Sequence, residues 1–78
     1  MKKVALVNYW DSFPFKYYGY EIPFFTFGLK DGDFVIVPVG EKITVARIAM
    51  IIPKKDFLLN NPNVQLKSII KKIDLERI

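Results

Sequence analysis

The chain has 78 residues, and its 12 basic and 8 acidic side chains give a net charge of +4. This length predicts one small domain over residues 1–78 and excludes enzymes that need two lobes or a dinucleotide fold. The absence of cysteine and histidine excludes disulfides, thiolate or imidazole metal sites and catalytic triads. We therefore expect a non-enzymatic protein with no cofactor and no metal, built on a core that the 51% hydrophobic content supplies.

The amino-terminal segment is basic and then apolar. Residues 4–7 are apolar and partly β-branched, which predicts a strand over residues 3–7. Asn8 and Asp11 interrupt the apolar run too early for a secretory signal or a membrane span. We expect a soluble, cytoplasmic protein that does not bind a membrane.

Aromatic residues crowd the segment between positions 9 and 27, among prolines and glycines. This mixture predicts short strands joined by tight connections, with a weak alternation over residues 15–18. The aromatic side chains either form a platform on which bases stack or fill the core of a small fold. Most phenylalanines suit the core, whereas side chains with polar tips suit a half-exposed site. The latter are Tyr9, Trp10, Tyr17, Tyr18 and Tyr20.

The middle of the chain predicts a hairpin. A turn signal at residues 31–33 precedes a strand at residues 34–37, and Pro38 should end its ladder because proline has no N–H. A second turn at residues 40–42 leads into the apolar run 43–52, which contains Arg47 and is closed by Pro53. A short loop between two such strands indicates an antiparallel pair.

The last third of the chain allows more than one interpretation. Residues 54–63 suit one helical turn or a loop. Leu66, Ile69, Ile70 and Ile73 have the spacing of a helical stripe, yet the segment also has the length and composition of a strand. Together, the elements predict an all-β fold: a small closed or half-closed β-barrel of 4–6 short strands with at most one short helical turn. Side chains fill so small a barrel, so a ligand must bind on its surface or between its loops.

Four stretches, in order, resemble one family. They are residues 4–6 (VAL), residues 15–17 (FKY, where the family has FDY), residues 32–40 (GDFVIVPVG) and residues 66–74 (LKSIIKKID). Their order and spacing resemble the amino-terminal 3′-DNA-end-binding domain of the primosomal replication-restart helicase PriA. The resemblance implies a small β-barrel that captures the 3′ end of a nascent strand, and a strand rather than a helix in the tail. A phosphate-binding loop of the helicase motor is absent, so the resemblance implies a free-standing version, as a phage or mobile element could encode.

One departure from the family concerns the predicted end-binding pocket. Lys16 stands where the family has an aspartate thought to contact the terminal 3′-hydroxyl. A carboxylate accepts a hydrogen bond from a hydroxyl, whereas an ammonium group only donates and prefers a phosphate. The predicted preference therefore moves from the 3′-hydroxyl towards the backbone.

Basic residues spread over the chain could form a phosphate-binding face or a solvated surface. Lysine outnumbers arginine, which fits loose backbone contact better than base readout. Arg47 lies within an apolar strand and is held in place there, or it pairs with Glu41 or Asp33 across the hairpin. The predicted DNA-binding residues are Tyr9, Trp10, Lys16, Tyr17, Tyr18, Lys42 and Arg47.

The leading hypothesis is a DNA-binding module for 3′ ends or single strands in replication restart, with DNA and a helicase or other replication protein as partners. The alternative is a protein-interaction module that docks a partner or self-associates through the phenylalanine-rich loop at residues 22–27. Salt separates the two hypotheses, because DNA binding weakens steeply as salt rises and apolar docking does not. The oligomeric state is left open.

Overall fold

The computed structural model describes residues 2–10, 16–23, 26 and 28–73. Five strands and one helix follow in chain order: β1 (Lys3–Tyr9), β2 (Tyr18–Glu21), β3 (Phe34–Val39), β4 (Lys42–Pro53), α1 (Lys54–Asn60) and β5 (Lys71–Ile73). The strands form one antiparallel sheet in the order β2-β1-β4-β3-β5. The prediction of a mainly β fold is therefore confirmed.

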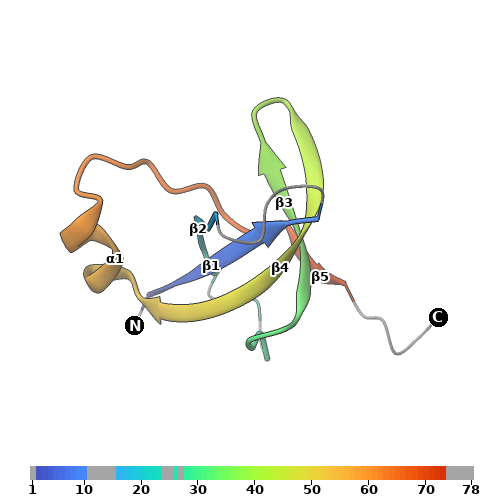
Figure 1. The fold of residues 1–78 in the computed structure, drawn as a ribbon, viewed down its shortest axis with the longest axis horizontal. Coiled ribbons are helices and arrows are strands. Elements are labelled where there is room, and N and C mark those ends of the chain that lie inside the picture. Colours follow the sequence, from blue (N-terminus) through green and yellow to red (C-terminus); the bar gives the residue numbers. More distant parts are fainter. Residues whose placement is uncertain (1, 11–15, 24–25, 27, 74–78) are drawn as a thin grey trace.

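The long strand β4 organises the sheet. Its first half pairs with β3 over Lys42–Arg47, and its second half pairs with β1 over Ala46–Pro53. The register with β1 shifts between Leu6 and Val7, where β4 carries an extra residue; such a bulge bends a strand. Figure 1 shows the resulting curved β4, which runs from the β3–β4 hairpin to α1 at the other end of the molecule.

The turns that flank β3 follow from glycine. Gly32 has a φ of +92° and the Asp33 N–H bonds to the Lys30 carbonyl, as in a type II turn. Gly40 has a φ of +60° as the first central residue of the β3–β4 hairpin, the glycine position of a type II′ turn. These turns confirm the predicted hairpin. However, the prediction that Pro38 ends the ladder is wrong, because Pro38 pairs with Ile43 of β4. On its other side, β3 pairs with β5 only at residues 34–36, so no acceptor of β5 is left without a donor at Pro38.

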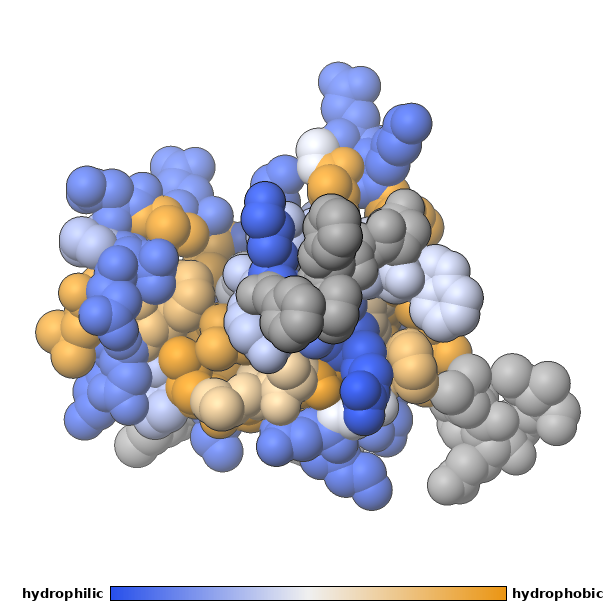
Figure 2. Space-filling view, in the orientation of Figure 1, coloured by the Kyte–Doolittle hydropathy of each residue, from blue (hydrophilic) through white to orange (hydrophobic). Residues whose placement is uncertain are grey.

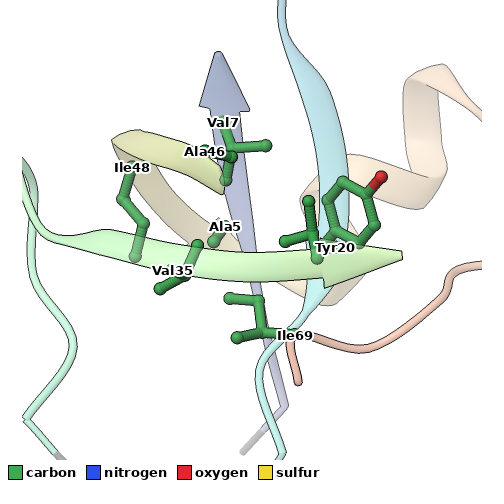
Figure 3. Close-up of a cluster of buried hydrophobic side chains, with 8 residues drawn as sticks. Ala5, Val7, Tyr20, Val35, Ala46, Ile48 and Ile69 are labelled. Carbon is green, nitrogen blue, oxygen red and sulfur yellow. The ribbon is translucent and has the colours of Figure 1, made fainter. Parts of the chain in front are cut away.

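The main cluster of buried side chains lies on one face of the curved sheet, whereas the fully buried Val4 lies on the other face, on the side of Phe57. The fully buried side chains of the main cluster come from β1, β3 and β4, and Figure 3 shows Tyr20 from β2 and Ile69 from the segment before β5 packed against them. Alternation along the strands places every second residue on this inner face. Val35 of β3 thus pairs with Ala46 of β4, and Ile48 of β4 pairs with Val7 of β1. Val37 is buried on the same face, two residues after Val35.

The sheet is not closed into a barrel, so the closed form of the predicted fold is wrong. The end strands β2 and β5 do not pair, because they are only four and three residues long. Instead, the extended segment before β5 crosses the gap: Glu21 of β2 bridges Ser68, and the Ile70 N–H bonds to the Ile36 carbonyl of β3 at 2.8 Å. In the described residues, these contacts place the segment before β5 between β2 and β3, where it covers the core without forming a continuous ladder with β2.

The tail is extended and not helical, so the helical interpretation of its apolar stripe is wrong and the strand interpretation holds for β5. Ile69 is 2% exposed and its neighbour Ile70 is 48% exposed, an alternation typical of an extended chain. The helix α1, with seven residues, is longer than the single turn expected. Pro53 precedes its first residue, and the Asn61 amide bonds to the Phe57 carbonyl at its end.

Candidate nucleic-acid interface

A groove of about 600 Å³ lies beside β2, between the sheet and the segment that follows α1. Its walls come from β1 and β2, from the β3–β4 turn, and from α1 with the connection to β5. Figure 2 shows hydrophilic side chains gathered over α1 and this connection, with hydrophobic surface beside them over β1 and β4. The groove exists because the sheet is open and the connection must pass over the β2 edge to reach β3.

Aromatic side chains line much of the groove. Tyr9 and Tyr18 stack with ring centroids 4.2 Å apart and planes 14° from parallel, and Tyr20 meets Tyr9 edge-on at 6.5 Å. The register explains this cluster, because Tyr18 and Tyr20 alternate with Gly19 and both project from β2 onto the inner face beside β1. Tyr17 and Phe57 complete the aromatic lining, and Tyr17 is 56% exposed.

A hydrogen-bond chain fixes the tyrosines along one wall. The Tyr20 hydroxyl donates to the Pro38 carbonyl at 2.7 Å, and the Tyr9 and Tyr20 hydroxyl oxygens lie 2.7 Å apart. Burial, reinforced by the Tyr9 hydroxyl, raises the pKa of Tyr20 far above its usual 10.0. Tyr20 therefore stays protonated. Its ring is buried and not half-exposed as its polar tip suggested, so it holds the other tyrosines in place.

The electrostatics of the groove are one-sided. Lys67 lines it together with the amide side chains of Asn60, Asn61 and Gln65, and no carboxylate is among its lining residues in the described chain. Outside the lining, an ion pair joins Lys54 Nζ to Glu21 at 2.8 Å, and the Lys54 hydrogen bond holds the pKa of the Glu21 carboxyl below its usual value. The groove can thus receive a planar, neutral or anionic group.

The predicted site residues lie in three places: in the groove, at its border and on the outer face of the sheet. Tyr9, Tyr17 and Tyr18 line the groove together. Lys16 and Lys42 border it without lining it: the exposed Lys16 precedes Tyr17, and the exposed Lys42 pairs with the lining residue Val39.

Trp10 and Arg47 lie on the opposite, outer face of the sheet. Trp10 is 76% exposed and borders an apolar hollow of about 350 Å³ with Phe34, Val45 and Ile73. Arg47 is exposed and pairs in register with Phe34. Neither described ion pair involves Arg47. Asp33, one of its two predicted partners, instead lies 3.5 Å from Lys72 Nζ.

Sequence reasoning missed part of the groove. Phe57, Asn60 and Asn61 lie in the segment predicted as a helical turn or loop, Gln65 follows it, and no role is predicted for any of them. They line the groove because α1 packs against β1 and β4, which brings the Phe57 ring beside Gly19 of β2. No local pattern marks such a long-range contact. Phe15 and the phenylalanines of the loop at residues 22–27 (Phe24, Phe25 and Phe27) lie outside the described residues.

Two classes of chemistry find no support in the described residues. No cluster of acidic side chains there could hold a metal ion. The only helix described, α1, is too short to cross a membrane.

Comparisons with protein-family models, with curated proteins and with solved structures found no match. The resemblance to the replication-restart domain therefore stays a prediction, carried by its four motifs alone.

Proposed function

We propose that the protein is a non-enzymatic DNA-binding module that holds single-stranded DNA, or the 3′ end of a strand, in the groove beside β2. The observation that carries this proposal is the composition of the groove: exposed and half-buried tyrosines, amide side chains and a lysine, with no carboxylate among its described lining. Such a surface suits a base or sugar joined to phosphate, since aromatic rings stack on bases of any type.

The position of the motifs supports the same function. Each of the four stretches that resemble the replication-restart domain contributes to the lining of the groove: Leu6, then Tyr17, then residues 38–40, then Lys67. Motifs that are distant in the sequence thus meet at one surface. This convergence favours replication restart as the setting, with a helicase or other replication protein as partner and the cytoplasm as the location.

Electrostatics supports DNA over an apolar ligand. The net charge is +4, and Lys67 lines the groove while Lys16 and Lys42 border it. Each lysine that neutralises a phosphate releases a counterion, so affinity depends on salt.

Fluorescence anisotropy with a labelled 3′-overhang duplex and a labelled single strand, over a salt series, tests the proposal. We expect binding at low salt that weakens steeply as salt rises. In Lys67→Ala the negative slope of log K against log salt should become less steep by about 0.7 for a single strand, because one phosphate contact is lost. Lys55→Ala is the matched control, because Lys55 is an exposed lysine of α1 outside the groove lining. Absence of binding at low salt would refute the proposal.

A second candidate function is protein interaction, and the apolar hollow on the outer face favours it. Trp10 and Ile43 are 76% and 64% exposed on that face, and exposed apolar surface of this kind often marks an interface. Self-association is the simplest form to test, by sedimentation of the wild-type protein and Trp10→Ala over a concentration series. Dimers that persist at high salt and disappear in Trp10→Ala would favour this function over DNA binding.

A further inference from the structure

The apolar hollow on the outer face of the sheet lies where β1 ends. Its lining in the described chain is made of apolar side chains: Trp10, Phe34, Val45 and Ile73. The hollow has a volume of about 350 Å³, which is more than a leucine side chain occupies. Because Trp10 is 76% exposed, the hollow is open to water. An apolar side chain from another molecule that filled it would remove this surface from water.

The rim of the hollow carries positive charge. Arg47 pairs in register with Phe34 and lies two residues from Val45, on the same face of β4. Lys71 lies two residues from Ile73 on β5, also on the same face. Both charged side chains are exposed, and neither belongs to an ion pair among the described residues. The group that suits this face is therefore an apolar side chain with a carboxylate beside it.

The exposed face of α1 has this combination of groups. Leu59 is 79% exposed and is the most exposed large apolar side chain of the described chain. Asp56 is also exposed and lies three residues before Leu59, so the two side chains are neighbours on the helix surface. No ion pair among the described residues includes Asp56. Lys55 is exposed next to it, so a contact with Arg47 would determine in which direction the helix lies.

We propose that this protein binds a second copy of itself head to tail, with Leu59 of one molecule in the apolar hollow of the next and Asp56 paired with Arg47. The inference rests on the second candidate function, protein interaction, and adds the partner and the contact; it is independent of DNA binding. The partner is a second copy because this chain exposes both complementary surfaces. Trp10 and Arg47 are of the residue types that most often dominate the binding energy of an interface.

The two complementary surfaces lie at opposite ends of the molecule. Figure 1 shows α1 and β5 at the two ends of the long axis. Val45 in the hollow and Lys54, the first residue of α1, are nine positions apart, which corresponds to about 30 Å of strand. Leu59 therefore lies far from the hollow of its own chain. A contact between two different surfaces leaves one of each free at the ends, so it continues into a ring or a filament.

The association should be weak, because one side chain and one exposed ion pair must offset the loss of translational and rotational freedom. We expect a dissociation constant on the order of 0.1–1 mM, so the protein is monomeric in dilute binding assays and associates in concentrated solution. The leucine in the hollow should contribute roughly 10- to 150-fold to the affinity. The ion pair should contribute at most about fivefold.

Two variants that each lack one half of the contact test the inference. Leu59→Ala keeps the hollow and Trp10→Ala keeps α1, and both should fold because both side chains are mostly exposed. In sedimentation equilibrium up to about 1 mM, we expect the wild-type protein to associate and each variant alone to stay monomeric. An equal mixture of the two variants should form heterodimers and nothing larger, because one intact hollow then meets one intact helix.

A control variant and NMR locate the contact. Met50→Ala removes an exposed apolar side chain of β4 outside the hollow and α1, so it should associate as the wild-type protein does. In the mixture, amide signals of α1 should shift when the isotope label is in Trp10→Ala. Signals around Phe34 and Val45 should shift when the label is in Leu59→Ala.

Charge reversal tests the predicted ion pair. Arg47→Glu and Asp56→Arg should each associate about two- to tenfold more weakly than the wild-type protein, because like charges then meet. An equal mixture of these two variants should recover the association, since each variant meets the opposite charge in the other. A mixture as weak as its components would exclude this pair from the contact.

The outcomes separate the inference from the function on which it rests. Association of Leu59→Ala alone would mean that two outer faces meet symmetrically, which overturns docking by α1 and leaves protein interaction in place. A wild-type protein that stays monomeric up to about 1 mM also overturns the inference. Association that Trp10→Ala does not weaken overturns both, because the hollow then has no role in it.

Discussion

Neighbouring residues of this chain belong to different surfaces because side chains alternate along a strand. Tyr9 stacks on Tyr18 at the groove, whereas Trp10, the next residue, borders the apolar hollow on the outer face. Ala46 is buried in the core, whereas Arg47 beside it is exposed on the outer face. A change at one residue therefore affects one surface and not the other.

Gly19 is the residue of β2 with the least room. A Cβ there would lie 2.6 Å from two ring atoms of Phe57 and 3.3 Å from a methyl group of Val4. The Phe57 ring would have to move, which would loosen α1 from the sheet. We predict that Gly19→Ala lowers the free energy of unfolding by about 1–3 kcal/mol, measured by urea denaturation.

The Phe57 ring provides the control for this prediction. In a Phe57→Leu background the added methyl group has more room, so Gly19→Ala should cost less than it does in the wild-type protein. Equal costs in the two backgrounds would mean that the ring of Phe57 does not press on Gly19.

At the scale of elements, the segment before β5 covers the core at the open side of the sheet. Ile69 is buried against the core and Ile70 is half exposed. We predict that Ile69→Ala destabilises the protein by about 2–4 kcal/mol, whereas Ile70→Ala costs under about 1 kcal/mol. Thermal or urea unfolding of the two variants measures both. Similar large losses would instead indicate the helical stripe, in which both isoleucines share the buried face.

The ion pair between β2 and α1 makes stability depend on pH. The Lys54 hydrogen bond lowers the pKa of the Glu21 carboxyl from its usual 4.5, so the pair stabilises the fold above that pH. Its contribution should disappear as pH falls through the lowered folded value. Both side chains are partly exposed, so we expect at most about 1 kcal/mol.

Glu21→Gln measures this contribution. The difference in unfolding free energy between the wild-type protein and the variant should be larger at pH 7 than at pH 3. A difference that does not change with pH would show that the Glu21 charge has no role in stability.

The elements that the sequence predicts well are those with strong local signals. The apolar runs of β1, β3 and β4 and the glycine turns around β3 predict the hairpin and its neighbour. The tail misleads because its isoleucines have helical spacing, whereas the backbone hydrogen bonds of Glu21 and Ile36 hold it extended. The tyrosines of the groove could be predicted from their polar tips. Strand alternation also predicts that they lie on a different face from Trp10 and Arg47. The contribution of α1 to the groove could not be predicted, because it depends on long-range contacts with the sheet.

At the scale of the whole molecule, the site depends on the sheet remaining open. A closed barrel would pair β2 with another strand along its length, and the connection after α1 would not have to pass over that edge. Here the four-residue β2 leaves its edge to this connection, and the space between them becomes a groove with tyrosines on one side and Asn61, Gln65 and Lys67 on the other. The shortness of β2 thus leaves the space that the groove occupies.

Comparing two exposed aromatic residues on opposite faces tests the central claim most directly. Single-stranded DNA binding should weaken by about 1–3 kcal/mol, roughly 5- to 150-fold, in Tyr17→Ala, because one base loses its stacking partner in the groove. Trp10→Ala, the matched control on the outer face, should bind as the wild-type protein does. Loss of binding in Trp10→Ala with full binding in Tyr17→Ala would place the DNA on the outer face and contradict the groove as its site.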